Sequence, residues 1–166
     1  MNNVYTDLPR DIPNHRGEHR LAKQLVNFHD TKAHFWFGLA QLPGVRDIDV
    51  LLWHELAGVF CIEVKAVSLS AVEEFDFNHC VITNRDRSDG PQIQAYKAGE
   101  SLHRFLKPII GSNTPFIIST ACWPLISRAE WRQTWNNEYL CNEYAERMIF
   151  EEDITAGSEA LVDRLK

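Results

Sequence analysis

Cysteine is scarce in this 166-residue sequence, and its four copies lie far apart along the chain: Cys61, Cys80, Cys122 and Cys141. No Cys-x-x-Cys pair is present and no histidine stands at zinc-ligand spacing, which excludes the usual zinc-ribbon and zinc-finger patterns. Long apolar runs are also absent and residues 1–7 are polar, so we expect neither a membrane span nor a secretory leader. The thiols are therefore expected to be reduced and the protein cytoplasmic.

An excess of basic charge is missing as well. The sequence has 17 Lys and Arg against 23 Asp and Glu, a net charge of −6 that argues against a tightly bound polyanion such as DNA. The acidity is uneven, because residues 1–128 hold 13 basic and 14 acidic side chains whereas residues 129–166 hold 4 and 9. The two parts therefore carry −1 and −5, and most of the acidity belongs to the tail.

What is present is the composition of one packed domain, with 45% apolar and 24% charged residues. Apolar periodicity predicts a helix over 14–28, and runs of strand-forming residues predict strands over 34–37, 47–53, 59–67, 75–83 and 116–123. The charged stretch 84–90 has no periodicity and predicts a loop. Helices and strands mixed in this order indicate an α/β fold.

A later helix is expected to begin at Pro91 and to run to about Leu106, with Pro108 closing it. Its apolar face is predicted to consist of Tyr96, Gly99 or Ala98, Leu102 and Leu106. Further along, the segment Ser127-Arg128-Ala129-Glu130 has the spacing of a capping box, so another short helix is expected to start there.

The C-terminal part, residues 127–166, is predicted to be an acidic extension of a core domain at residues 1–126. Its last helix has no C-cap before Lys166, so we expect that the chain was cut from a longer protein. Trp131, Trp135 and Tyr139 recur at i+4 and have two interpretations, a surface for a protein partner or, as we favour, cover for the domain's own core.

The strands at 47–53 and 59–67 are separated by a five-residue loop that ends in glycine, which predicts a hairpin. If Trp53 pairs with Val59, Asp49 lies opposite Glu63 and Asp47 lies opposite Lys65. Two carboxylates and an ammonium then gather on one patch of otherwise apolar strands.

Charges in such strands are costly unless they pair or bind a metal. A hard divalent cation relieves the repulsion between Asp49 and Glu63 and leaves Lys65 for a scissile phosphate or an attacking water, as in metal-assisted phosphodiester hydrolysis. An Asp–Lys ion pair with Glu63 at an exposed strand edge explains the same residues about equally well. The hairpin alone does not decide between the two.

Two more residues bear on the choice. Glu18 shares the apolar face of the first helix with Leu21 and Leu25, so it could join a metal site, although a carboxylate that the helix dipole favours is the simpler interpretation. Gln94 stands in the first turn of its helix, where it could contact a phosphate or position water, or could equally be a solvated surface side chain.

Taken in order, the motifs resemble the NERD, or nuclease-related, domain of the PD-(D/E)XK nuclease superfamily, which includes restriction endonucleases and archaeal Holliday-junction resolvases. The motifs are Gly17-Glu18, Asp47-Ile48-Asp49-Val50, Gly58-Val59-Phe60-Cys61-Ile62-Glu63-Val64-Lys65 and Pro91-x-x-Gln94-Ala95. The resemblance covers about residues 17–124 and implies a restriction-endonuclease-like fold, a mixed central sheet flanked by helices with an αβββαβ core.

The resemblance also implies roles for the motif residues. Asp49 and Glu63 would bind Mg²⁺ or Mn²⁺ with Glu18 near the metal, Lys65 would position or activate the nucleophilic water, and Gln94 would support the site. The proline that nominally precedes the motif aspartate is absent, and Asp47 is a second candidate ligand. We favour Asp49 because of its register with Glu63.

The implied function is metal-dependent hydrolysis of DNA in DNA repair, other processing or defence. The alternative is a non-catalytic DNA-binding or protein-interaction module that keeps the nuclease fold. Such domains often precede a helicase module in a longer protein, so residues 127–166 are expected to form the linker region that leads into one.

Overall fold

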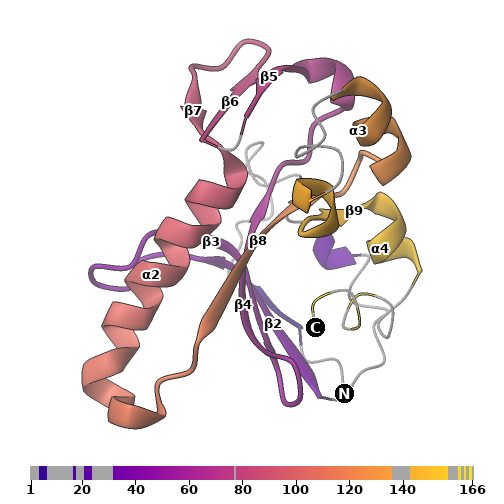
Figure 1. Cartoon of the computed structure of the whole chain (residues 1–166). Coiled ribbons are helices and arrows are strands. Elements are labelled where there is room, and N and C mark those ends of the chain that lie inside the picture. Colours follow the sequence, from indigo (N-terminus) through magenta and orange to yellow (C-terminus); the bar gives the residue numbers. More distant parts are fainter. Residues whose placement is uncertain are drawn as a thin grey trace.

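The computed structural model describes residues 4–6, 17, 21–23, 32–76, 78–135, 143–156, 161, 163 and 165. Its centre is a mixed six-stranded sheet of order β1-β2-β3-β4-β8-β9 (Figure 1). These strands are β1 (Val4–Thr6), β2 (Ala33–Leu39), β3 (Ile48–His54), β4 (Gly58–Val64), β8 (Ile117–Trp123) and β9 (Ile149–Phe150). Strands β2, β3 and β4 are antiparallel neighbours, whereas the pairs β1–β2, β4–β8 and β8–β9 are parallel. The predicted α/β class is confirmed.

A second, three-stranded sheet is inserted between β4 and the long helix α2 (Pro91–Ile110). After the short helix η2 (Leu69–Ala71) come β5 (Val72–Phe75), β6 (His79–Ile82) and β7 (Ser88–Asp89), at the top of Figure 1. The prediction of a loop over 84–90 was wrong at its end, because residues 88–89 pair with 79–80 of β6. Two residues are too few for a hydrophobic pattern to mark a strand.

Helix α2 begins where predicted, with Gly90 as N-cap and Pro91 in its first turn, but it continues past Pro108. Proline lacks an N–H and its ring crowds the carbonyl four residues earlier, but in the last turn of a helix it removes only a single hydrogen bond. The turn is closed by the N–H of Gly111, which donates to the carbonyl of Lys107. After it come the short helix η3 (Gly111–Asn113) and Phe116, which is exposed and precedes β8, although we predicted it within the strand.

The buried face of α2 is formed by small side chains together with Leu102, as predicted, whereas Tyr96 is 56% exposed, contrary to the prediction. At Gly99 the helix lies too close to the sheet for a side chain. A Cβ added at Gly99 would come within 2.8 Å of the Ser119 hydroxyl oxygen. Because the interface selects small residues, Tyr96 is turned outward.

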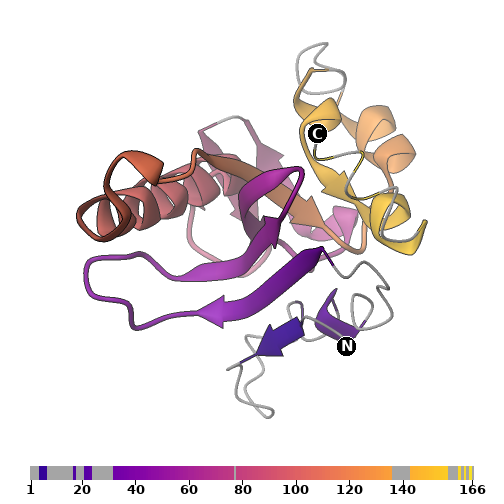
Figure 2. The same ribbon diagram turned by 90° about the horizontal axis from the view of Figure 1, so that it is seen from below.

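Two hydrophobic clusters cover the opposite side of the sheet and the base of the inserted sheet. The first joins Phe35, Phe37 and Phe60 to Leu21 of the first helix and to Leu161. Figure 2 shows the helical residues near the N-terminus and α2 on opposite sides of the central sheet. Of the predicted helix over 14–28, residue 17 and residues 21–23 are helical, and the remainder lies outside the described residues.

The second cluster packs Phe75 of the inserted sheet against residues from the C-terminal part, among them Trp131 and Phe150. The predicted capping box is confirmed at the start of α3 (Arg128–Thr134), where Ser127 and Glu130 exchange hydrogen bonds. Helix α4 (Glu151–Thr155) follows β9. Residues beyond 126 therefore contribute β9, α3, α4 and core side chains to the same body as the central sheet.

No described helix is both long and apolar enough to cross a membrane.

Candidate functional site

The β3–β4 hairpin has the predicted register at its loop end, with Trp53 paired to Val59, but its ladder stops at Val50–Ile62. The expected direct pairing of Asp49 with Glu63 is not part of the ladder. Like charges placed directly opposite in a sheet repel. At this point the Asp49 carboxylate accepts a hydrogen bond from β4 in place of a backbone carbonyl of β3. Its Oδ2 accepts a hydrogen bond from the N–H of Val64 at 2.8 Å, which holds the half-buried carboxylate between the two strand ends.

Lys65 follows the last residue of β4 and does not pair with Asp47, contrary to the predicted register. Its Nζ donates to Glu63 Oε1 at 2.6 Å and to Gln94 Oε1 at 2.9 Å. The Lys65 and Glu63 side chains are each only 13% exposed, so the ion pair is largely shielded from water. A lysine ammonium has three donors, and the described residues accept two of them.

Gln94 connects the lysine to the inserted sheet. While its Oε1 accepts from Lys65, its Nε2 donates to the carbonyl of Asp89 at 2.5 Å. Asp89 in turn pairs through Oδ2 with Lys97, one helical turn after Gln94. This chain of contacts fixes the position of the Gln94 amide and therefore that of the Lys65 ammonium. Neither helix periodicity nor residue spacing predicted this support, because Asp89 was predicted to lie in a loop.

One cleft is lined by Asp47, Asp49, Glu63 and Gln94, together with Arg46, Ser88 and their neighbours. The structure thus brings three of the predicted site residues to one hollow, with Lys65 bonded to two of them. Asp47 is exposed and lies before β3, whereas Asp49 is half-buried within it. The held carboxylate is that of Asp49, the residue that the register favoured.

The pKa of the Cys61 thiol reflects the negative charge close to this cleft. Burial first, and then the nearby negative carboxylates of Glu63 and Asp49, raise the pKa of this thiol to about 12. Cys61, Leu51 and α2 lie in a third hydrophobic cluster, on the sheet face opposite the N-terminal helix. Two carboxylates therefore lie close to one buried point of that face, beside the ammonium of Lys65.

Glu18 lies outside the described residues. Its preceding residue, Gly17, packs directly on the segment that follows the lysine, because a Cβ at Gly17 would come within 2.3 Å of the Ala66 Cβ. Only glycine allows so close an approach. The first motif of the sequence therefore contacts Ala66, the residue that directly follows the third motif.

The donors offered to a cation are oxygens. Asp49 and Glu63 offer hard carboxylate oxygens of the kind that Mg²⁺ and Mn²⁺ prefer, so the chemistry of this pair fits such an ion. Within the part of the chain that the structure describes, no group of three or more His, Cys, Asp or Glu residues is arranged to hold a metal. A third protein carboxylate would have to come from elsewhere.

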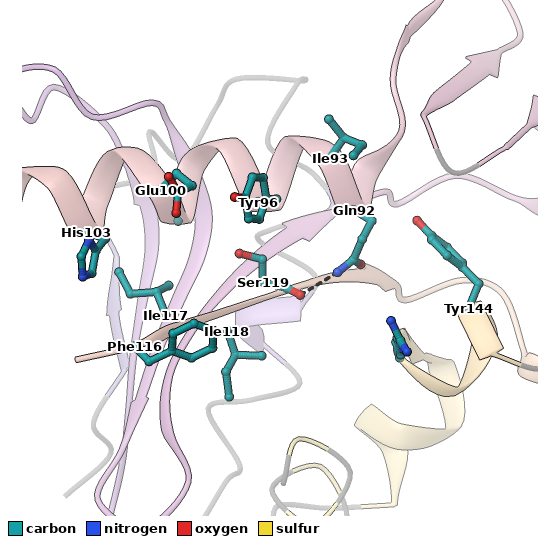
Figure 3. A pocket seen from close by; sticks show the side chains of 12 residues that line it. Gln92, Ile93, Tyr96, Glu100, His103, Phe116, Ile117, Ile118, Ser119 and Tyr144 are labelled. Carbon is teal, nitrogen blue, oxygen red and sulfur yellow. Dashed lines mark hydrogen bonds between the residues drawn. The ribbon is translucent and has the colours of Figure 1, made fainter.

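A second hollow lies on the other side of the first turn of α2, between this helix and β8 (Figure 3). Tyr96, Phe116 and Ile117 line it, and Gln92 spans it with Nε2 donating to the carbonyl of Ser119 at 2.6 Å. Among the described residues that line it, Glu100 is the single carboxylate and there is no lysine. The acid–acid–lysine chemistry belongs to the first hollow.

Together these features define an α/β protein whose mixed sheet and flanking helices are compatible with the restriction-endonuclease-like fold. The chain belongs to the nuclease-related domain (NERD) family, whose model matches residues 13–127. All five predicted site residues lie inside the matched region. No curated protein and no solved structure matches the chain.

Proposed function

We propose that this chain is a divalent-metal-dependent deoxyribonuclease that hydrolyses phosphodiester bonds in the cleft at the end of β3 and β4. The observation that carries the proposal is the hydrogen-bonded set Glu63–Lys65–Gln94, with Asp49 in the same cleft. Membership of the nuclease-related family supports the same reaction class. The proposed ions are Mg²⁺ and Mn²⁺.

In this proposal Asp49 and Glu63 hold the ion, with Glu18 as a further ligand. The bound ion would supply a nucleophilic water and neutralise charge that develops on the phosphate. Asp49 is positioned for this role by the N–H of Val64, which fixes one carboxylate oxygen. The donor of Lys65 that the described residues leave unused would point a hydrogen bond at the attacking water or at a phosphate oxygen.

Gln94 acts as a positioning residue. Its amide is bonded on both sides, to the Lys65 ammonium and to the backbone of Asp89, so it fixes the ammonium before substrate arrives. Preorganised charge of this kind accelerates a reaction because no reorganisation is needed as the transition state forms.

The alternative is a module that binds DNA or protein without catalysis. The complete set of acids and lysine favours catalysis, because a binding module has no use for an ammonium buried between a carboxylate and an amide. The aromatic stripe that could have served a protein partner is turned inward at Trp131, which is fully buried, and Tyr139 lies outside the described residues. The core interpretation of Trp131 is confirmed.

The test is cleavage of supercoiled, linear duplex and single-stranded DNA in Mg²⁺, in Mn²⁺ and in EDTA. Wild-type protein is expected to cleave only with metal, and Lys65→Ala to lose at least about 100-fold in rate. Lys107→Ala is the matched control, because Lys107 is exposed in the last turn of α2, away from the cleft. Cleavage by Lys65→Ala at the rate of Lys107→Ala would reject the proposal.

We further propose a cytoplasmic role in DNA repair, other processing or defence, with a helicase module following in a longer protein. Because β9 and α4 belong to the body of the central sheet, such a linker would begin after residue 156. The coding sequence downstream of Lys166 tests this directly.

A further inference from the structure

Four rings form a row on three adjacent strands of the central sheet, which we call the aromatic row: Tyr5 of β1, His34 and Trp36 of β2, and Trp53 of β3. Tyr5 and Trp36 have ring centroids 5.3 Å apart and planes 15° apart, and Tyr5 and His34 are 6.2 Å and 4° apart. His34 and Trp53 are 4.9 Å apart at 34°. Side chains from three strands thus present rings of similar orientation.

The row is not part of the core. Along β2 the side chains alternate, with Phe35 and Phe37 buried in the cluster on the opposite face and His34 and Trp36 only partly covered. Tyr5 remains 46% exposed and Trp53 remains 40% exposed. Exposed aromatic side chains gathered in one place on a soluble protein mark a binding surface more often than scattered ones do.

The row lies on the same face of the sheet as the proposed catalytic carboxylates. On β3 the residues Asp49, Leu51 and Trp53 alternate with the buried Val50 and Leu52 and therefore share one face. The ladder continues that face onto β2, where Trp36 pairs with Leu51 and His34 with Trp53. Neighbouring strand positions thus connect the row to the cleft without a change of face.

The separation suits a polynucleotide. Four residues of extended strand span about 13 Å between Asp49 and Trp53, the length of about four stacked nucleotides. Leu51, half-buried in the cluster with α2, lies between these two positions on β3, so a DNA strand whose phosphate lies at Asp49 and Glu63 would reach the row by passing over Leu51. Bases in a duplex are stacked and paired, whereas bases of an unpaired strand can turn toward aromatic rings.

We propose that the aromatic row binds unpaired bases of the DNA substrate by stacking, so that the enzyme acts on DNA with a single-stranded segment beside the cleaved bond. This inference rests on the proposed nuclease function, since it names the substrate class of that same site. Stacking of bases on aromatic side chains is tolerant of sequence, so the row selects unpaired DNA without reading a particular base.

The test is equilibrium binding of a fluorescent single-stranded oligonucleotide and of its duplex in EDTA, where metal-dependent cleavage cannot occur. Trp53→Ala is expected to weaken single-strand binding about tenfold, because each base stacked on an aromatic ring contributes separately to the affinity. Duplex affinity is expected to stay unchanged, because the bases of a duplex are already stacked and paired. Trp53→Phe keeps an aromatic ring and is expected to recover most of the affinity. Phe116→Ala, at an 83% exposed ring outside the row, is the control and is expected to bind like wild type.

A second variant protects the result against misfolding. Tyr5 lies on the edge strand β1 and is half-exposed, so Tyr5→Ala is also expected to weaken single-strand binding, with a melting temperature close to that of wild type. The proposed role of the aromatic row would be rejected by any of three results: wild-type affinity for single strands in both alanine variants, an equal loss of affinity for duplex, or no single-strand binding by wild type. Single-strand binding that depends on Trp53, without cleavage of any DNA, would reject the proposed nuclease activity and support base stacking on the aromatic row.

Discussion

Asp49 accepts a hydrogen bond from the backbone of Val64, and this contact stands where the next rung of the β3–β4 ladder would be. A side chain has replaced a backbone carbonyl as the acceptor. The replacement lets the two strands separate at their charged ends while the Val64 N–H stays satisfied. The same contact distinguishes Asp49 from Asp47, which lies exposed before the strand.

Asparagine at position 49 is expected to keep the acceptor and to remove the charge. Asp49→Asn should therefore fold with nearly wild-type stability, and its metal binding and DNA cleavage should both fall by at least about 100-fold. Asp49→Ala should in addition lose about 1–3 kcal/mol of unfolding free energy, because the N–H of Val64 loses its partner. Calorimetric Mn²⁺ titration, cleavage assays and urea unfolding measure the three effects.

Asp47→Asn is the matched control. It changes the same charge two residues away in the same cleft and is expected to retain metal binding within a few-fold. A larger loss in Asp47→Asn than in Asp49→Asn would assign the ligand to Asp47 instead.

Gln94→Ala is expected to reduce the rate of DNA cleavage about 10- to 100-fold while leaving metal affinity nearly unchanged. Loss of a residue that orients a catalytic group has effects of this size, and Gln94 contacts the lysine and not the oxygens proposed to bind metal. Gln92→Ala, on the other side of the same helical turn, controls for general damage to α2. Equal rates for both variants would remove Gln94 from the site.

Much of the hairpin could be predicted, because apolar alternation and a five-residue loop set the register at Trp53–Val59. The capping box at Ser127 was also predictable, since it depends on two residues three apart. The end of the ladder was not, because it depends on repulsion and on one side-chain hydrogen bond between Asp49 and Val64 that spacing does not encode. The roles of Asp49, Glu63, Lys65, Glu18 and Gln94 stay predictions.

Other features depended on tertiary packing. The outward turn of Tyr96 follows from how closely α2 approaches Ser119 at Gly99, a distance that helix periodicity cannot supply. The support of Gln94 comes from a two-residue strand, too short to leave a pattern. Tyr5 belongs to the aromatic row because β1 pairs in parallel with β2 and places Tyr5 beside Trp36. No local sequence pattern near residue 5 predicted a strand.

Arg128 is expected to stabilise the join between α3 and the C-terminal elements. It pairs with Asp153 at 2.6 Å with both side chains 13% exposed, and its guanidinium lies 4.8 Å from the centre of the Phe150 ring. Arg128→Ala should lower the unfolding free energy by about 3 kcal/mol, because it leaves a mostly buried carboxylate unpaired. Urea unfolding measures the change.

Arg132→Ala supplies the comparison for Arg128. Arg132 pairs with Glu146 at the surface, where the two side chains are 41% and 52% exposed, so its loss should cost less than about 1 kcal/mol. Equal costs for the two variants would show that the Arg128 pair has no special weight in the fold.

The raised pKa of Cys61 predicts that the free energy of unfolding falls at alkaline pH. Its pKa in the folded protein is raised from 9.0 to about 12 by burial first and then by Glu63 and Asp49. Above pH 9 the unfolded thiol ionises while the folded one keeps its proton, so the contribution present below pH 9 is lost as pH rises toward 12. The slope should approach about 1.4 kcal/mol per pH unit.

The alkaline contribution of Cys61 is isolated by difference. Urea unfolding at about pH 8 and about pH 10.5 should show a smaller drop for Cys61→Ala than for wild type, whatever the cost of the substitution itself at pH 8. An equal drop in both proteins would mean that the folded and unfolded thiols ionise alike.

The most direct test of the proposed nuclease site is the rate of cleavage of plasmid and of single-stranded DNA in Mn²⁺ by wild type, Glu63→Gln and Glu74→Gln. Glu63 contacts Lys65 in the cleft, whereas Glu74 is an exposed residue of the inserted sheet. We predict metal-dependent cleavage by wild type and Glu74→Gln, and a rate at least about 100-fold lower for Glu63→Gln with unchanged folding. Cleavage by Glu63→Gln at the wild-type rate, or no cleavage of plasmid or single-stranded DNA by wild type in either Mg²⁺ or Mn²⁺, would contradict the proposed nuclease site.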